Sequence, residues 1–132
     1  MEIDFRAILA GDVALIGLVS TRIYPSTYPQ SATDPCIRYT KITGSDALHM
    51  QGADGLDFSL MQLDVRAASA ASALAVRNAL RALLNPFSGI QGATDFRLIT
   101  LRDDRGIRFE LTGAQEFYTI SLDFDVISRA AA

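Results

Sequence analysis

The chain has 132 residues, of which 49% are hydrophobic and 20% are charged. This composition supplies enough apolar side chains for a packed core, which excludes disorder for most of the chain, and the length fits a single domain over residues 1–132. A net charge of -3, one cysteine and one histidine exclude a general attraction to nucleic acid, an intrachain disulfide and a cysteine-rich zinc site.

The apolar stretch near the N-terminus resembles neither a secretion signal nor a membrane span. Residues 7–19 are apolar except for Asp12, and Glu2 and Asp4 precede them where a signal peptide would be basic. No uninterrupted apolar run approaches the roughly 18 residues that a membrane span needs. We therefore expect no membrane segment, and a protein that is made and used in a cytoplasm or in something assembled there.

Two short helices are predicted within residues 4–19. Asp4 is placed to cap the first helix, and Gly11 is placed to end it in a left-handed conformation. Asp12 is then placed to cap the second helix. Three prolines follow before residue 36, which predicts an extended surface connector.

Two strands are predicted after this connector. Residues 36–42 alternate in polarity, residues 56–65 form a second apolar run, and a polar loop from Gly44 to Gly55 separates them. The apolar residues of the second run change face near Leu60. This change indicates either a bulge that exchanges the faces or a second half that is covered on both sides.

The main helix is predicted over about residues 69–84, with Ser69 as its cap and a proline shortly after its end. Its apolar positions recur at the spacing of one buried stripe. Leu74 lies on the opposite, polar side together with Arg77 and Arg81. A large aliphatic side chain there is either covered by arginine stems or buried by another chain.

Three strands are predicted over about residues 96–127. Residues 96–101 and 106–111 flank the turn-rich tetrad Asp103 to Gly106, which predicts a hairpin with a polar tip. Residues 118–126 alternate without a break, so one face of this strand is core and the other is wet or lines an opening. The elements together predict an α+β fold, an antiparallel or mixed sheet with one main helix packed on it and short N-terminal helices.

A search for chemistry finds no catalytic, cofactor-binding or metal-binding motif. Cys36 and His49 could pair as nucleophile and base, but a cysteine at a strand start is more typical of a small buried residue. Asp123 and Asp125 could hold a cation with an acidic residue of the hairpin, although two carboxylates on a strand face are more often only solvated. We therefore predict no catalytic residue, no cofactor and no metal, and a protein that is not an enzyme.

Several segments of the chain form an ordered set of motifs. Arg-Ile-Tyr-Pro at residues 22–25 follows a short helix, and Met-Gln-Leu-Asp-Val at residues 61–65 leads into the main helix. The closing strand carries the pattern Tyr118, Ser121 to Phe124. Each segment alone is unspecific, whereas the ordered set, over about residues 5–126, resembles the phage tail-completion family, whose members are tail terminators.

The resemblance implies a structural virion protein of a siphophage or a related tail-like particle. Such a protein forms a ring, hexameric in this family, on the end of the tail tube, stops tube elongation and offers a surface for head-tail joining. Its partners would be other copies of itself, the tail tube protein and a head connector or stopper protein. DNA would pass through the lumen without specific binding, and the ring would lie in the neck of the virion after assembly in the host bacterial cytoplasm.

Two other functions stay open at this point. Another neck protein, such as a head-completion or connector subunit, shares the small size and the ring, and a small metal- or cysteine-dependent enzyme is the candidate from a different class. For the ring, the expected oligomer interface comprises Leu74, Arg77, Arg81 and Arg105. The residues expected to face the lumen or a neighbour are Asp123, Asp125, Asp54 and Asp57, because a bore without excess arginine does not retain DNA.

Overall fold

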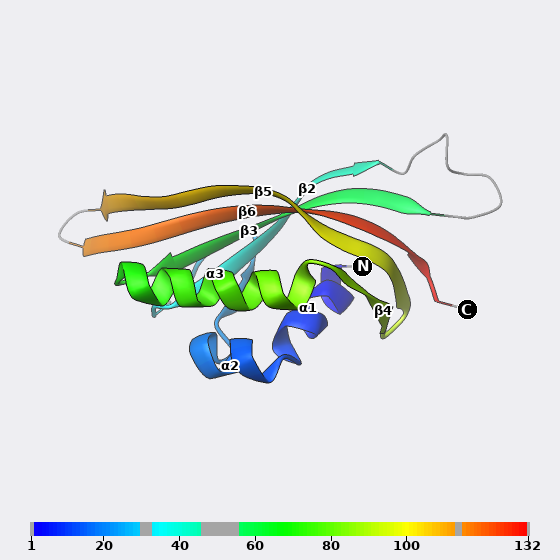
Figure 1. The fold of residues 1–132 in the computed structure, drawn as a ribbon, viewed down its shortest axis with the longest axis horizontal. Coiled ribbons are helices and arrows are strands. Elements are labelled where there is room, and N and C mark those ends of the chain that lie inside the picture. Colours follow the sequence, from blue (N-terminus) through cyan, green and yellow to red (C-terminus); the bar gives the residue numbers. More distant parts are fainter. Residues whose placement is uncertain (1, 30–32, 46–55, 113–114, 132) are drawn as a thin grey trace.

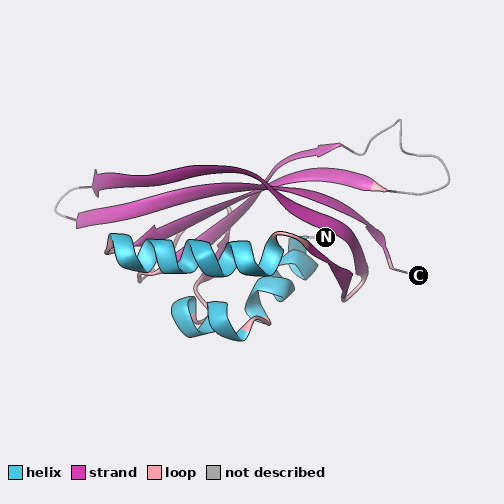
Figure 2. Cartoon of the chain, in the orientation of Figure 1, coloured by secondary structure: helices cyan, strands magenta, loops and turns pink. Residues whose placement is uncertain are grey.

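The computed structural model describes residues 2–29, 33–45, 56–112 and 115–131. These residues form two layers, a six-stranded sheet and three helices that all lie on one of its faces (Figures 1 and 2). The elements in chain order are α1 (Glu2–Ala10), α2 (Val13–Val19), β1 (Ile23–Pro25), β2 (Cys36–Ser45), β3 (Asp57–Ala67), α3 (Ala70–Leu84), β4 (Phe87–Gln91), β5 (Thr94–Thr112) and β6 (Gln115–Ala130).

The sheet is mixed, with the strand order β1-β2-β3-β6-β5-β4. Only β1 and β2 run parallel, and every other neighbouring pair is antiparallel. The predicted α+β class is therefore confirmed. Within the described part of the chain, no helix is long and apolar enough to cross a membrane.

The two N-terminal helices are present, but only the second has the predicted cap. The carboxylate of Asp12 accepts a hydrogen bond from the backbone N–H of Leu15 at 3.0 Å, which satisfies a free donor at the start of α2. Helix α1 begins at Glu2, so the prediction that Asp4 caps it is wrong. Asp4 instead accepts a hydrogen bond from the hydroxyl of Thr94 at 2.6 Å and so joins α1 to the start of β5.

The structure of the connector and of β2 differs in its details from the prediction. The proline-rich connector contains the short strand β1, which was not predicted. Strand β2 continues to Ser45, so the predicted loop begins later than Gly44, and its remaining residues, 46–55, lie outside the described residues. A bulge near Leu60 was one of two alternatives for β3; the bulge at this level of the sheet lies instead on the partner strand, between Lys41 and Thr43 of β2.

Strand β3 keeps its faces and is covered on both sides in its second half. Met61, Leu63 and Val65 are buried on the helix side, and Asp64 between them is buried on the other side. The second of the two sequence alternatives is therefore the correct one. The cover on the far side comes from polar side chains.

Helix α3 has the predicted bounds, and Ser69 caps it by accepting a hydrogen bond from the N–H of Ser72 at 3.2 Å. The helix lies across β3, β5 and β6, with α2 packed against it (Figure 1). The largest fully buried side chains of the core are Phe5, Phe96, Phe124, Leu9, Leu15, Ile23, Ile37, Met61, Leu63, Leu80, Leu84 and Ile99.

The predicted hairpin at Asp103 to Gly106 is wrong, because β5 runs through it as one strand of 19 residues. Both halves of β5 pair with β6, and the pairing register shifts between Asp104 and Ile107. Gly106 has φ +77, and its N–H donates to the Asp104 carboxylate at 2.9 Å. The turn-forming residues thus build a bulge within a strand, a structure with the same need for glycine and aspartate as a hairpin.

The actual tight turn lies earlier, between β4 and β5, at Gly92. This residue has φ +60, and a Cβ atom there would overlap with the Asp4 carboxylate. We expect Gly92→Ala to lower the free energy of unfolding by roughly 1–3 kcal/mol, because it adds left-handed strain and displaces Asp4 from Thr94. Urea unfolding followed by circular dichroism measures this change.

Gly17→Ala is the matched control for this substitution. Gly17 lies inside α2 with open space where the Cβ would sit, so alanine should stabilise the protein by about 0.5–1 kcal/mol. Equal effects of the two alanine substitutions would contradict the account of Gly92.

Candidate functional site

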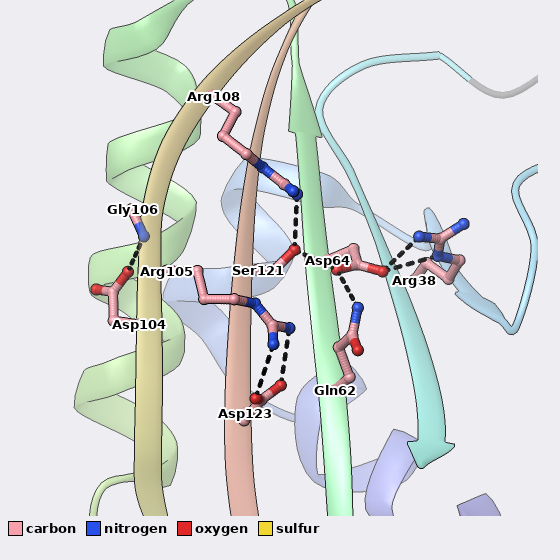
Figure 3. Close-up of polar contacts among 9 residues, drawn as sticks. All are labelled: Arg38, Gln62, Asp64, Asp104, Arg105, Gly106, Arg108, Ser121 and Asp123. Carbon is pink, nitrogen blue, oxygen red and sulfur yellow. Dashed lines mark hydrogen bonds and ion pairs between the residues drawn. The ribbon is translucent and has the colours of Figure 1, made fainter.

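The face of the sheet without helices carries a network of paired charges at its centre (Figure 3). The side chains come from the four neighbouring strands β2, β3, β6 and β5. They include arginines of the two outer strands and carboxylates of the two inner strands. We call this network of Arg38, Gln62, Asp64, Arg105, Arg108, Ser121 and Asp123 the polar centre.

Asp64 is the most enclosed charge of the polar centre, since only 2% of its surface is exposed. Its Oδ1 atom accepts hydrogen bonds from Gln62 at 2.8 Å and from the Ser121 hydroxyl at 2.7 Å. Its Oδ2 atom accepts from the guanidinium of Arg38, with the Nε donor at 3.0 Å. Burial alone would raise the pKa of Asp64, but the hydrogen bonds from Gln62, Ser121 and Arg38 hold that pKa below its ordinary value.

The polar face of β6 is covered by arginines from β5. Arg105 forms two hydrogen bonds to the carboxylate of Asp123, at 3.0 and 2.9 Å, and Arg108 donates to Ser121 at 3.0 Å. Ser121 and Asp123 are consequently buried. The prediction that this face of β6 is wet or lines an opening is therefore wrong at these positions, while Asp125 remains half-exposed and pairs with Arg102 at 3.1 Å.

Aromatic rings extend the polar centre toward the connector. The ring of Tyr28 has Arg38 at 5.0 Å and Arg66 at 4.5 Å from its centroid, and Phe117 has Arg66 at 4.8 Å. The hydroxyl of Tyr28 donates to the backbone carbonyl of Asp64 at 3.0 Å, and burial raises the pKa of Tyr28. These contacts fix the connector against β3.

The described residues show no arrangement that favours catalysis. None of their buried side-chain nitrogen or oxygen atoms lacks a hydrogen-bond partner, and they contain no group of three or more potential metal ligands. Cys36 is fully buried, and burial raises the pKa of its thiol to about 11, which disfavours the reactive thiolate. His49 lies outside the described residues.

A second surface lies where α3 runs beside β5. Strand β4 pairs with β5 only up to Ile99, so the described part of β5 from Thr100 onward forms a sheet edge. Asp104 on this edge pairs with Arg81 at 3.3 Å and with Arg77 at 3.6 Å. We call Leu74, Arg77 and Arg81 of α3 the α3 flank.

The structure brings three of the four predicted interface residues together on this flank. Leu74 is half-buried and packs partly against the core, one turn before Arg77. Arg105 is separated from them because its guanidinium turns to the polar centre. Of the predicted acidic residues, Asp57 begins β3 and is exposed, and Asp54 lies outside the described residues.

Sequence reasoning missed two features. The role of Asp64 had no separate signal, because a polar residue between Leu63 and Val65 fits the alternation of an ordinary strand. The other feature is a row of exposed apolar side chains on β5, Ile107, Phe109 and Leu111, whose alternation was visible but was assigned to an ordinary hairpin strand. The ring of Phe109 lies 5.3 Å from that of Tyr118.

Comparison with known proteins places the chain in a family. The model of the family described as "Tail completion protein gp17" matches residues 4–129. A chain of the solved structure "Virion of native gene transfer agent (GTA) particle" has the same fold, with a TM-score of 0.68, 17% sequence identity, and coverage of 95% of this chain and 90% of that one. The search of curated proteins found no significant match.

We expect Asp64→Asn to lower the free energy of unfolding by about 2–4 kcal/mol, because the neutral amide leaves Arg38 without its buried counter-charge. The contribution of this carboxylate should also depend on pH. Since the folded-state pKa lies below that of the unfolded chain, the stabilisation is complete above pH of about 4 and is lost as the pH falls through the folded-state value.

Chemical denaturation at several pH values measures both effects. The difference between wild type and Asp64→Asn should shrink as the pH falls, whereas Asp125→Asn, at a more exposed pair, should cost no more than about 1 kcal/mol at any pH. A difference for Asp64→Asn that does not change with pH would contradict the assigned pKa.

Proposed function

The chain belongs to the family of tail completion protein gp17, and from this we propose that it is a structural virion protein that terminates the tail. In this proposal copies of the chain form a ring, hexameric as the sequence resemblance implies, on the last ring of the tail tube. The ring stops elongation of the tube and offers the surface at which the head is joined. The family match over residues 4–129 is the observation that carries the proposal.

The fold supports this role in two ways. The whole described chain forms one sheet with its helices, so we propose that residues 1–132 act as a single domain. The gene transfer agent chain with the same fold comes from a virion structure, which suits a virion location for this chain. The proposed partners are other copies of the chain, the tail tube protein and a head connector or stopper protein, and assembly would take place in the host bacterial cytoplasm.

We propose that the sheet face without helices faces the lumen, where DNA passes. Three of its arginines pair with carboxylates of the same subunit, Arg38 with Asp64, Arg105 with Asp123 and Arg102 with Asp125, while Arg108 donates to the Ser121 hydroxyl. Arginines bind DNA by neutralising its phosphates, which releases the cations condensed on the DNA, and guanidinium groups already held by carboxylates bind phosphate less strongly. Such a face lets DNA pass without retaining it. Asp57 and Asp54, at the start of β3 and before it, are then proposed to face a neighbour.

We place the oligomer interface at the α3 flank, beside the free edge of β5. Leu74 supplies an apolar contact, and Arg77 and Arg81 supply charge next to Asp104. Arg105 contributes indirectly in this proposal, by fixing Asp123 on the lumen face. An interface with an apolar centre and a charged rim is the common arrangement of stable subunit contacts.

Electron microscopy of particles produced without this protein tests the proposed function. A terminator should leave tails that are overlong and lack heads, because nothing stops the tube and nothing joins it. Tails of normal length that accompany heads without a completed neck would instead identify a head-completion or connector subunit, and the proposal would be wrong.

We expect Leu74→Glu to reduce ring formation on tail tubes, because the carboxylate would be buried at the subunit contact. Since Leu74 packs partly against the core, the substitution should also cost about 1–2 kcal/mol of stability, which circular dichroism and urea unfolding would quantify. Ala82→Glu, at an exposed position on the solvent side of the same helix, is the control and should assemble normally. Normal capping by a folded Leu74→Glu protein would place this residue outside the interface.

A further inference from the structure

The exposed apolar row on β5 lies on the same face of the sheet as the core, but its side chains are left uncovered. Ile107 pairs with Ile120 of β6, and Phe109 pairs with Tyr118, so the row shares the helix-side face with the buried Ile120. Nevertheless Ile107, Phe109 and Leu111 are exposed by 40%, 54% and 64%. We call these three residues the β5 stripe. Contiguous exposed apolar side chains of this kind mark sites of protein contact.

A complementary apolar surface lies at the junction of α1 and α2. It is a hollow of about 360 Å³ lined by Ala10, Gly11, Asp12, Val13, Ile16 and Gly17. Val13 at its rim is 88% exposed, although it is a large aliphatic residue. Gly17 contributes no side chain, and the space where its Cβ would sit is open. We call this surface the helix hollow.

The two surfaces lie on different parts of one molecule. The stripe lies on the C-terminal part of β5, whereas α2 is the element farthest from the sheet (Figure 1). A contact between the stripe of one copy and the hollow of the next is therefore head-to-tail. Repetition of a head-to-tail contact closes a ring when the rotation per subunit divides a full turn.

We propose that the β5 stripe of each subunit packs into the helix hollow of the neighbouring subunit, with Phe109 as the central anchor. This inference rests on the proposed function, because it names the contact that builds the ring. The volume of the hollow accommodates an aromatic side chain, and aromatic anchors in pockets dominate the energy of many interfaces. A second copy is the favoured occupant because the chain itself supplies both apolar partners.

The charges around the two surfaces agree with this pairing. The helical segment 2–19 carries the three carboxylates of Glu2, Asp4 and Asp12 and a single guanidinium, that of Arg6. Lys41 pairs with Glu2, so this side keeps one negative charge in excess. On the stripe's face of the sheet, the single carboxylate of Asp104 is shared by Arg77 and Arg81 of the α3 flank, which leaves one positive charge in excess. A surface with an excess of negative charge thus meets one with an excess of positive charge, which favours the head-to-tail orientation over two like surfaces.

Disulfide trapping on tail tubes tests the contact directly. A chain with Phe109→Cys and Val13→Cys should form covalent multimers under mild oxidation when it caps tubes isolated from particles that lack this protein. The native Cys36 is fully buried and should not react. The matched control combines Val13→Cys with Glu110→Cys, because the next residue along a strand points to the opposite face and should trap no neighbour.

Two substitutions supply an independent measurement. Phe109→Asp and Val13→Asp should each reduce the fraction of capped tube ends by more than about tenfold, as loss of a central anchor does. Leu111→Asp, at a more exposed position of the stripe, provides a second variant should Phe109→Asp fold poorly. Ile90→Asp alters an equally exposed aliphatic residue on β4, outside both surfaces, and should cap normally.

The outcomes separate the contact from the proposed function. Multimers from the Phe109 and Val13 pair, together with loss of capping by the aspartate variants, support the contact. Normal capping by wild type and by all aspartate variants, without trapped multimers, overturns the contact and leaves the terminator function intact. If the Phe109→Cys chain alone is trapped as a dimer or is cross-linked to the tube protein, the proposed contact is wrong and that other occupant is identified. A wild-type chain that caps no tubes overturns both proposals.

Discussion

The buried carboxylate of Asp64 is the constraint on which the sheet face without helices depends. A charge so enclosed costs several kcal/mol unless it is paired and hydrogen-bonded, and here Arg38, Gln62 and Ser121 together satisfy both oxygens. Meeting this requirement ties β2, β3 and β6 together through side chains in addition to their backbone ladders. Arg108 then attaches β5 through the hydroxyl of Ser121.

Because of this polar network, the two faces of the sheet are stabilised in different ways. The helix side obtains stability from apolar packing, and on the other side paired charges hold neighbouring strands together. A surface whose charges are largely paired suits a protein past which DNA is proposed to move. The proposed subunit contacts lie at the margins of the sheet, where apolar residues of β5 have no cover from the described part of the same chain.

Local sequence signals predicted an element correctly where only one structure satisfies them. The caps at Asp12 and Ser69 were correct because each carboxylate or hydroxyl precedes free N–H donors that it can reach. Asp4 was misassigned because its partner, Thr94, is 90 residues away in sequence. The Asp103 to Gly106 segment was misassigned because a bulge and a hairpin turn use the same residues, and only the pairing with β6 decides between them.

The candidate surfaces were harder to predict than the core, since they depend on long-range pairing. Leu74 was found because it breaks the polarity pattern of its helix, whereas Asp64 and Phe109 fit the alternation of ordinary strands. Their significance follows from which elements cover them and which do not. Burial of Asp64 requires β2 and β6 on the two sides of β3, and β5 beside β6, an arrangement that no local segment contains.

The margins of the sheet also oppose uncontrolled association between copies of the chain. One edge consists of β1, a strand of three residues that ends in Pro25, and of the part of β2 beyond it, which carries a bulge between Lys41 and Thr43. The free part of the other edge, on β5, is interrupted by register shifts after Leu101 and after Asp104. Proline and bulges block the regular ladder by which strands of different molecules join. These features oppose the growth of fibres from concentrated copies and leave the proposed ring contacts as the route to association.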